Sequence, residues 1–99
     1  MGDDGEGRRN RVGPVLQRGP VAEAVLAAIC AENTDVELLD RGAYVRVLVA
    51  RRCVVTRQAI EAHLGRPFRL PADLEPVMPA FKGRFFVSED QGVWEVRSP

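Results

Sequence analysis

The feature that most constrains the fold is a segment with apolar residues at alternate positions, followed closely by a segment with the start and stop signals of a short helix. Residues 40–47 (DRGAYVRV) contain a glycine turn and then valines at alternate positions, as in a half-buried strand. In residues 56–68, a threonine suited to capping a helix precedes the stop signal Leu64-Gly65-Arg66-Pro67-Phe68. This pairing predicts a mixed α+β fold. Neither segment carries a nucleophile–base pair or a metal-ligand cluster, so the pattern favours binding of another macromolecule over chemistry.

The chain length predicts one small domain preceded by a flexible tail. A chain of 99 residues can bury a single modest core. Residues 1–11 are rich in glycine and charge and cannot bury enough apolar surface to offset the entropy of ordering. We therefore expect a flexible N-terminal tail over 1–11 and a single domain over 12–99.

The first half of the domain predicts a strand and a helix. Residues 12–16 have strand character, and Pro14 favours a sheet edge or a bulge. Gly19-Pro20 predicts the start of a helix, because proline fits the first helical turn. Apolar residues then recur at helical spacing over 21–29. Asn33 marks the end of this helix, where asparagine tolerates a left-handed backbone.

A β-hairpin is predicted to follow this helix. Residues 36–39 and 43–51 form its two strands around the turn Asp40-Arg41-Gly42, whose glycine supplies a positive φ. Residues 53–55 are placed to extend the same pairing.

The last part of the chain predicts a short helix and a final strand pair. The helix is capped by Thr56 and ends at Gly65, and prolines over 70–79 leave room for only a turn or two of further helix. Residues 81–87 and 93–97 form the final pair. The predicted order is β-α-β-β-α-β-β, an α+β sandwich with helices packed on a sheet.

The charge balance excludes broad classes of partner. Fourteen basic residues balance fourteen acidic ones, whereas binding to nucleic acid or to a membrane surface needs surplus positive charge. No apolar run approaches the roughly 18 residues that span a bilayer, and residues 1–11 lack the apolar stretch of a secretory signal. We expect a cytoplasmic protein whose two cysteines, Cys30 and Cys53, stay reduced.

The residue types needed for catalysis are sparse. His63 is the single histidine, and no serine or cysteine stands at a spacing that suggests a dyad. Cys30 and Cys53 lack metal-ligand spacing and fit small buried hydrophobes better than nucleophiles. Glu61 and Glu75 are expected to be solvated. We therefore expect no enzyme activity, no cofactor and no metal site.

Arginines form the more informative polar set. Two interpretations stay open, a solvated face or the rim of an interface that steers a partner. Arg66 lies between a helix-ending glycine and a proline, which restrict its backbone and suit it to a fixed contact. The arginines concerned are Arg46, Arg51, Arg52, Arg57, Arg66 and Arg69, and the large apolar residues predicted for the core are Phe68, Phe81, Phe85 and Trp94.

Two other functions share a topology of this kind. A small-molecule regulatory module of β-α-β-β-α-β type would need a defined pocket. A binder of single-stranded RNA would need two or three exposed aromatic residues on the sheet, and Tyr44 is the one plausible candidate.

Six short stretches occur in a specific order along the chain and carry a family resemblance. They are Val12-Gly13-Pro14-Val15, residues 40–47, Thr56-Arg57, residues 64–68, Leu74-Glu75 and Ala80-Phe81-Lys82-Gly83-Arg84. Together they resemble the small effector, or coupling, proteins of bacterial multicomponent di-iron monooxygenases, the MmoB/DmpM family, which includes components of toluene, phenol and methane monooxygenases. The resemblance runs from Val12 to about Trp94 and is nearest to the aromatic or alkene hydroxylase branch.

The resemblance implies a cofactor-free protein, monomeric when free, that docks on the hydroxylase component of a di-iron monooxygenase. There it would modulate oxygen activation, turnover and regiospecificity. Thr34 departs from the family pattern, in which a proline is common after the asparagine. The resemblance implies docking through Asn33 and Arg66, which match positions implicated in the family. Further candidates for the contact are Gln17, Glu23, Tyr44 and Arg46.

Overall fold

The computed structural model describes residues 10–97. Of the predicted tail, only the last two positions are described, and they correct its boundary. The Asn10 carbonyl accepts a hydrogen bond from the Arg51 N–H, and Arg11 already pairs with Ala50. The elements in chain order are β1 Arg11–Gln17, α2 Pro20–Glu32, β2 Glu37–Asp40, β3 Tyr44–Ala50, β4 Arg52–Thr56, α3 Arg57–Leu64, the 3-10 helix η1 Glu75–Val77, β5 Ala80–Lys82, β6 Arg84–Val87 and β7 Gln91–Glu95.

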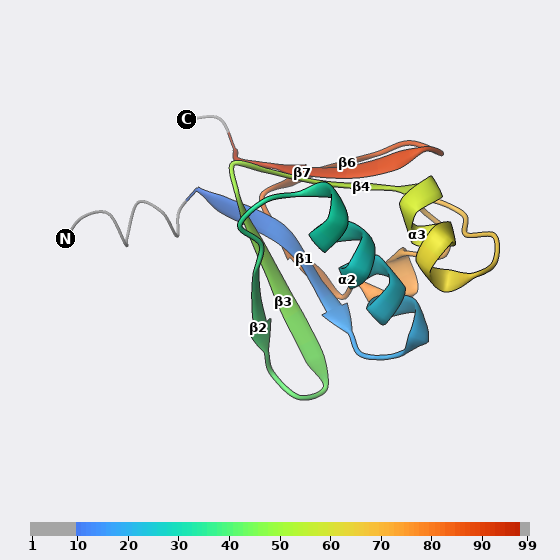
Figure 1. The fold of residues 1–99 in the computed structure, drawn as a ribbon. Coiled ribbons are helices and arrows are strands. Elements are labelled where there is room, and N and C mark those ends of the chain that lie inside the picture. Colours follow the sequence, from blue (N-terminus) through green and yellow to red (C-terminus); the bar gives the residue numbers. More distant parts are fainter. Residues whose placement is uncertain (1–9, 98–99) are drawn as a thin grey trace.

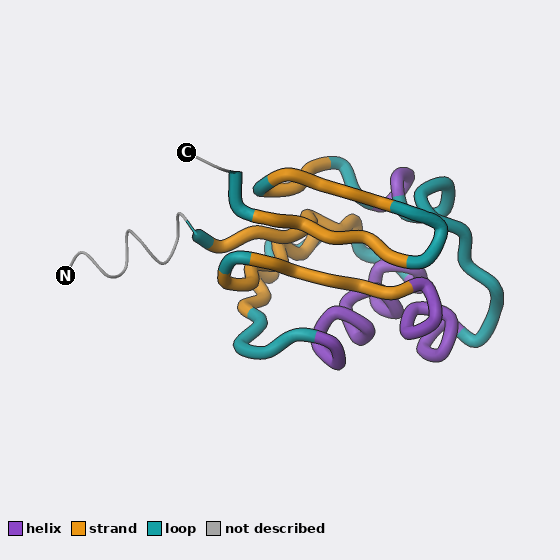
Figure 2. Tube along the Cα trace, turned by 90° about the horizontal axis from the view of Figure 1, so that it is seen from above, coloured by secondary structure: helices purple, strands orange, loops and turns teal. Residues whose placement is uncertain are grey.

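Residues 10–97 fold into two antiparallel sheets and two α-helices. Strands β2, β3, β1 and β5 form the first sheet in that order, and β4, β7 and β6 form the second, which lies across the upper end of the first (Figure 1). Every neighbouring pair of strands is antiparallel. The two helices lie together on one side of the strands (Figure 2). The predicted α+β class, with helices packed on a sheet, is confirmed.

The strand order differs from the predicted one in two places. The strand expected over 43–51 ends at Ala50, because Arg51 takes a left-handed backbone with a φ of 69°. Residues 52–56 therefore form a separate strand in the second sheet instead of extending the hairpin. The strand expected over 81–87 splits at Gly83 into β5 of the first sheet and β6 of the second. The observed order is β-α-β-β-β-α-β-β-β.

Pro14 lies in an interior strand, so the edge position, one of the two predicted alternatives, is wrong. Strand β1 is flanked by β3 on one side and by β5 on the other. The ladder with β3 is interrupted at Gly13 and Pro14, and these two residues are paired with β5 instead. Proline has no N–H to donate to a neighbouring strand. It is tolerated here because the β1–β3 ladder makes no bond at this position.

Both helices begin and end close to the predicted residues. Helix α2 starts at Pro20 after Gly19. Asn33 follows it with extended backbone (φ −131°), so the left-handed geometry expected there is wrong. In α3 the Thr56 hydroxyl accepts from the Ala59 N–H at 3.1 Å, and Gly65 closes the helix with a left-handed φ of 80°. Both predicted caps of α3 are confirmed.

The core lies between the helices and the inner faces of the sheets. Helix α2 packs against α3 and β4 and buries one face, and Val45, Val47 and Val49 of β3 belong to the same core cluster. Phe68 and Trp94 are buried as predicted. The buried residues of α2 are Ala22, Ala24, Val25, Leu26, Ala28 and Ile29.

The remaining predicted core aromatics are more exposed. Phe85 is half-buried and stacks on Trp94 with 4.8 Å between ring centroids. Phe81 is 45% exposed, so its prediction as a core residue is wrong. It lies on the short strand β5 and contacts the core through a tilted contact with the ring of Phe85.

The two cysteines are unpaired and differ in environment. Cys53 is fully buried, and burial raises the pKa of its thiol to about 12. Cys30 is exposed, so its prediction as a buried hydrophobe is wrong. In the described part of the chain, neither helix is long and apolar enough to span a membrane.

Candidate partner-binding surface

Arg66 is presented by a short loop whose backbone is held on both sides. Preceding it, the Gly65 N–H donates to the carbonyl of Glu61 at 2.8 Å. Following it, the Phe68 N–H donates to the carboxylate of Glu61 at 2.9 Å, and the Phe68 ring is 1% exposed. Arg66 and Pro67 themselves are exposed. The loop therefore displays Arg66 from a rigid base, as the sequence predicted.

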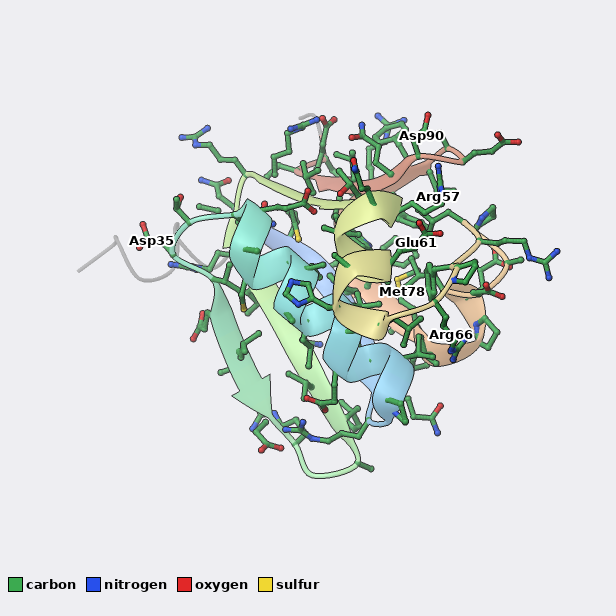
Figure 3. The ribbon with its side chains drawn as sticks, turned by 45° about the vertical axis from the view of Figure 1, so that its right-hand side comes forward. Asp35, Arg57, Glu61, Arg66, Met78 and Asp90 are labelled. Carbon is green, nitrogen blue, oxygen red and sulfur yellow. The ribbon has the colours of Figure 1, made fainter. Side chains whose placement is uncertain are left out.

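The Glu61 carboxylate is held by Arg57, so the prediction that Glu61 is solvated is wrong. The two side chains form an ion pair at 3.3 Å one helical turn apart. Arg57 also reaches the hairpin between β6 and β7: its Nε donates to the Glu89 carbonyl at 3.1 Å, and its guanidinium lies 3.5 Å from the Asp90 carboxylate. Figure 3 shows Asp90, Arg57, Glu61 and Arg66 following one another along one side of the molecule. The i,i+4 spacing of Arg57 and Glu61 is the sequence signal that could have indicated this pair.

A groove of about 350 Å³ lies beside this loop. We call the loop around Arg66, together with this groove, the α3 loop surface. The residues that line the groove are a mixture of apolar and charged side chains. Among residues 10–97, Arg66 and Arg69 make no ion pair of their own, so their guanidinium groups are available to a partner. The groove is lined by Arg57, Glu61, Pro67, Phe68, Arg69, Leu70 and Glu89.

Asn33 is not part of the α3 loop surface. Its Nδ2 donates to the carbonyls of Ile29 and Val54, both at 2.8 Å, and its Oδ1 accepts from the Val54 N–H at 3.0 Å. Because β4 is an edge strand, the amide of Asn33 pairs with its outer edge as another strand would. The neighbouring Glu32 accepts from the N–H and the hydroxyl of Thr56 at 2.8 and 2.7 Å. The end of α2 thereby covers the free edge of β4.

Glu23 lies near the opposite end of α2, in a cluster of exposed charges. Arg18 pairs with Glu23 at 2.8 Å and with Asp40 at 2.9 Å. The Gly42 N–H and the Arg18 guanidinium lower the pKa of the Asp40 carboxyl, and the hydrogen bond to Glu23, followed by the charge of Asp40, raises the pKa of Arg18. These contacts join the start of α2 to the β2–β3 turn.

Gln17, Tyr44 and Arg46 gather on the outer face of the first sheet. Gln17 is opposite Tyr44 in the register of β1 and β3, and Arg46 is two residues further along β3. All three side chains are exposed. The six predicted contact residues therefore occupy separate regions of the described structure. Asp35, just beyond Asn33, and Arg66 lie on opposite sides of the paired helices (Figure 3).

Metal-ligating side chains are scattered over the described residues. In the segment 10–97 no group of three or more histidine, cysteine or carboxylate side chains is placed to bind a metal ion. His63 is exposed on α3.

Comparison with known proteins identifies the family. A profile of the MmoB/DmpM family matches residues 10–95, and the chain belongs to this family. It is 43% identical over 91 residues to the effector subunit of the alkene monooxygenase system of Xanthobacter autotrophicus (strain ATCC BAA-1158 / Py2), covering 90% of this chain and 89% of that protein. The protein is accordingly an effector subunit of a monooxygenase system and not its catalytic subunit. This favours the effector interpretation over the small-molecule module and the RNA binder.

Solved structures share the fold. A chain from the structure of the phenol hydroxylase–regulatory protein complex has a TM-score of 0.76 at 21% identity, covering 86% of this chain and 95% of its own. The regulatory protein B of soluble methane monooxygenase has a TM-score of 0.68 at 19% identity, covering 89% of this chain and 66% of its own.

Proposed function

We propose that this effector subunit docks on the hydroxylase component of a di-iron monooxygenase through the α3 loop surface. Docking changes oxygen activation, turnover and regiospecificity in the partner. The observation that carries the proposal is the match to an effector subunit over 90% of the chain. Phenol hydroxylase in complex with its regulatory protein supplies a precedent for such docking in a protein of the same fold.

An effector without chemistry of its own acts by binding one conformation of its partner more tightly than another. The shift that it causes cannot exceed this difference in affinity, and a coupling of about 1–3 kcal/mol changes the linked equilibrium from several-fold to over a hundredfold. A rigid surface suits this role, because little binding free energy is spent on ordering it. The loop around Arg66, held at Gly65 and Phe68, meets this requirement.

The proposal extends to the remaining properties of the protein. We assign it to the cytoplasm, which is supported by the unpaired thiols of Cys30 and Cys53. The chain from Asn10 onward acts as one domain, monomeric when free and carrying no cofactor. Direct contact through Asn33, Gln17, Glu23, Tyr44 and Arg46 stays a prediction.

Arg66→Ala is expected to weaken activation of the hydroxylase. A system reconstituted from hydroxylase and reductase is titrated with the effector, and turnover and product ratios are measured. Wild-type protein should raise turnover or coupling with saturation. Arg66→Ala should raise the half-maximal effector concentration about tenfold, since central arginines at interfaces contribute more than about 1 kcal/mol.

The matched control is Arg41→Ala, which removes an exposed arginine at the tip of the β2–β3 turn. It should titrate like the wild type. No effect of saturating wild-type protein would contradict the proposed function, and equal titrations for Arg66→Ala and Arg41→Ala would contradict the proposed surface.

A further inference from the structure

We infer that Glu61 is the positioning residue of the Arg66 loop, and that Arg57 holds Glu61 in place. The inference rests on the proposed function, since it concerns how the proposed contact residue is presented. Glu61 does not itself need to touch the partner. Its role is to fix the backbone from which Arg66 projects.

A single residue fixes both flanks of the exposed dipeptide Arg66-Pro67. The backbone carbonyl of Glu61 accepts from the Gly65 N–H at 2.8 Å, while its side-chain carboxylate accepts from the Phe68 N–H at 2.9 Å. The first bond belongs to the helix cap, and any residue at position 61 could supply it. The second requires an acceptor at the end of a side chain of this length. It is also charge-assisted, which makes it stronger than a neutral bond.

Arg57 orients the carboxylate and connects it to the second sheet. Its guanidinium lies between Glu61, at 3.3 Å, and Asp90, at 3.5 Å, and its backbone N–H donates to the Asp90 carbonyl at 2.8 Å. The side chain of Glu61 is 28% exposed, and its carboxylate contacts both the Arg57 guanidinium and the Phe68 N–H. Helix α3, the loop and the β6–β7 hairpin therefore share one polar network.

The consequence for binding is that Arg66 and Glu61 act as a unit. Without the bond to the Phe68 N–H, the loop would sample several conformations, and binding would have to select the one that places Arg66 correctly. That ordering cost lowers affinity without the loss of any direct contact. Once the loop has lost this bond, truncating Arg66 should lower the affinity for the partner only slightly further.

The first test concerns the free protein. Exchange of the Phe68 amide hydrogen with solvent is measured by NMR for the wild type, Glu61→Ala and Glu61→Gln. Glu61→Ala should speed exchange of this amide about tenfold or more, because the acceptor is lost. Glu61→Gln keeps an acceptor oxygen at the same reach and should restore most of the protection. Equal exchange in Glu61→Ala and the wild type overturns the inference, whatever the hydroxylase does.

The second test is a double-mutant cycle in the reconstituted system. Glu61→Ala alone should raise the half-maximal effector concentration about fivefold, with the maximal turnover little changed, and Glu61→Gln should largely rescue it. In the double variant, Glu61→Ala should raise the half-maximal effector concentration less than twofold above that of Arg66→Ala alone, whereas independent effects would multiply. The control is Glu95→Ala. The Glu95 carboxylate pairs with Arg52 on another strand at 3.3 Å, so any effect of this substitution should multiply with that of Arg66→Ala.

The outcomes separate the two proposals. If Arg66→Ala weakens activation but Glu61→Ala does not, the positioning role is wrong and the proposed surface stands. If Arg66→Ala has no effect, the proposed surface is wrong and the inference about presenting Arg66 falls with it. Should Glu61→Ala fail to fold, Arg57→Ala takes its place in the cycle. Arg57→Ala releases the Glu61 carboxylate, and its effect on the half-maximal effector concentration should be non-additive with that of Arg66→Ala in the same way. If the effects of Arg57→Ala and Arg66→Ala multiply fully, the inference is overturned.

Discussion

Replacing Gly83 by alanine is expected to lower the free energy of unfolding by about 3 kcal/mol or more. Gly83 has a φ of +102°, and a Cβ built there would lie 2.6 Å from both the Glu95 carbonyl oxygen and the Cγ1 of Val12. The Glu95 oxygen belongs to the backbone and the Val12 side chain is buried, so neither can move away without a large cost in free energy. For a domain of this size the melting temperature should fall by about 12–24 °C. Thermal and chemical denaturation measure the loss.

Gly42→Ala is the matched control for this prediction. Gly42 has a φ of +82°, but apart from Gly42 and its two chain neighbours, none of the described residues has a heavy atom within 4 Å of the position where its Cβ would be. This substitution incurs only the backbone cost of a left-handed alanine, about 1 kcal/mol. If the two variants lose equal stability, close packing at the passage from β5 to β6 is not what requires glycine at position 83.

Asn33→Ala is expected to lower the free energy of unfolding by about 2 kcal/mol. The substitution removes three hydrogen bonds and leaves both the N–H and the carbonyl of Val54 without the amide that pairs with them. These groups are partly buried at the edge of β4, so solvent replaces the lost bonds incompletely. Urea denaturation followed by circular dichroism measures the change.

The adjacent Thr34→Ala serves as the control for Asn33. Thr34 is exposed, and its side chain makes no hydrogen bond to the other described residues. Its substitution should change stability by less than about 0.5 kcal/mol. A fully stable Asn33→Ala protein with impaired activation would instead assign Asn33 to direct contact with the partner and contradict the structural role derived for it.

The helices and the first hairpin could be predicted from the sequence because their signals are local. Pro20, Thr56 and Gly65 each act on the backbone within a few residues, and each lies where the sequence placed it. The alternating valines of β3 likewise identify their buried face without knowledge of the partner strand. Local chemistry therefore determined the type and the ends of most elements.

The division into two sheets could not be predicted in the same way. Cys53 pairs with Trp94, and Pro14 pairs with Phe81, in each case far along the chain. Strand propensity does not say which strand a segment will pair with. A positive φ at Arg51, which is not a glycine, is also invisible to a search for turn residues.

The candidate site shows the same limit. Arg66 was predicted because the neighbouring glycine and proline reveal a restricted backbone. Glu61 was missed because its partner, the Phe68 N–H, is a main-chain group brought to it by the turn after α3. Asn33 was expected to reach a partner protein, yet its amide bonds to β4, a contact that depends on how the end of α2 packs.

Hydrogen–deuterium exchange of the effector, alone and with saturating hydroxylase, tests the central claim most directly. We predict slower exchange over residues 57–70 on addition of hydroxylase, with the largest change around Arg66 and Phe68. Protection confined to other segments would show that the hydroxylase binds a different face. Unchanged exchange throughout the chain would contradict docking on the hydroxylase altogether.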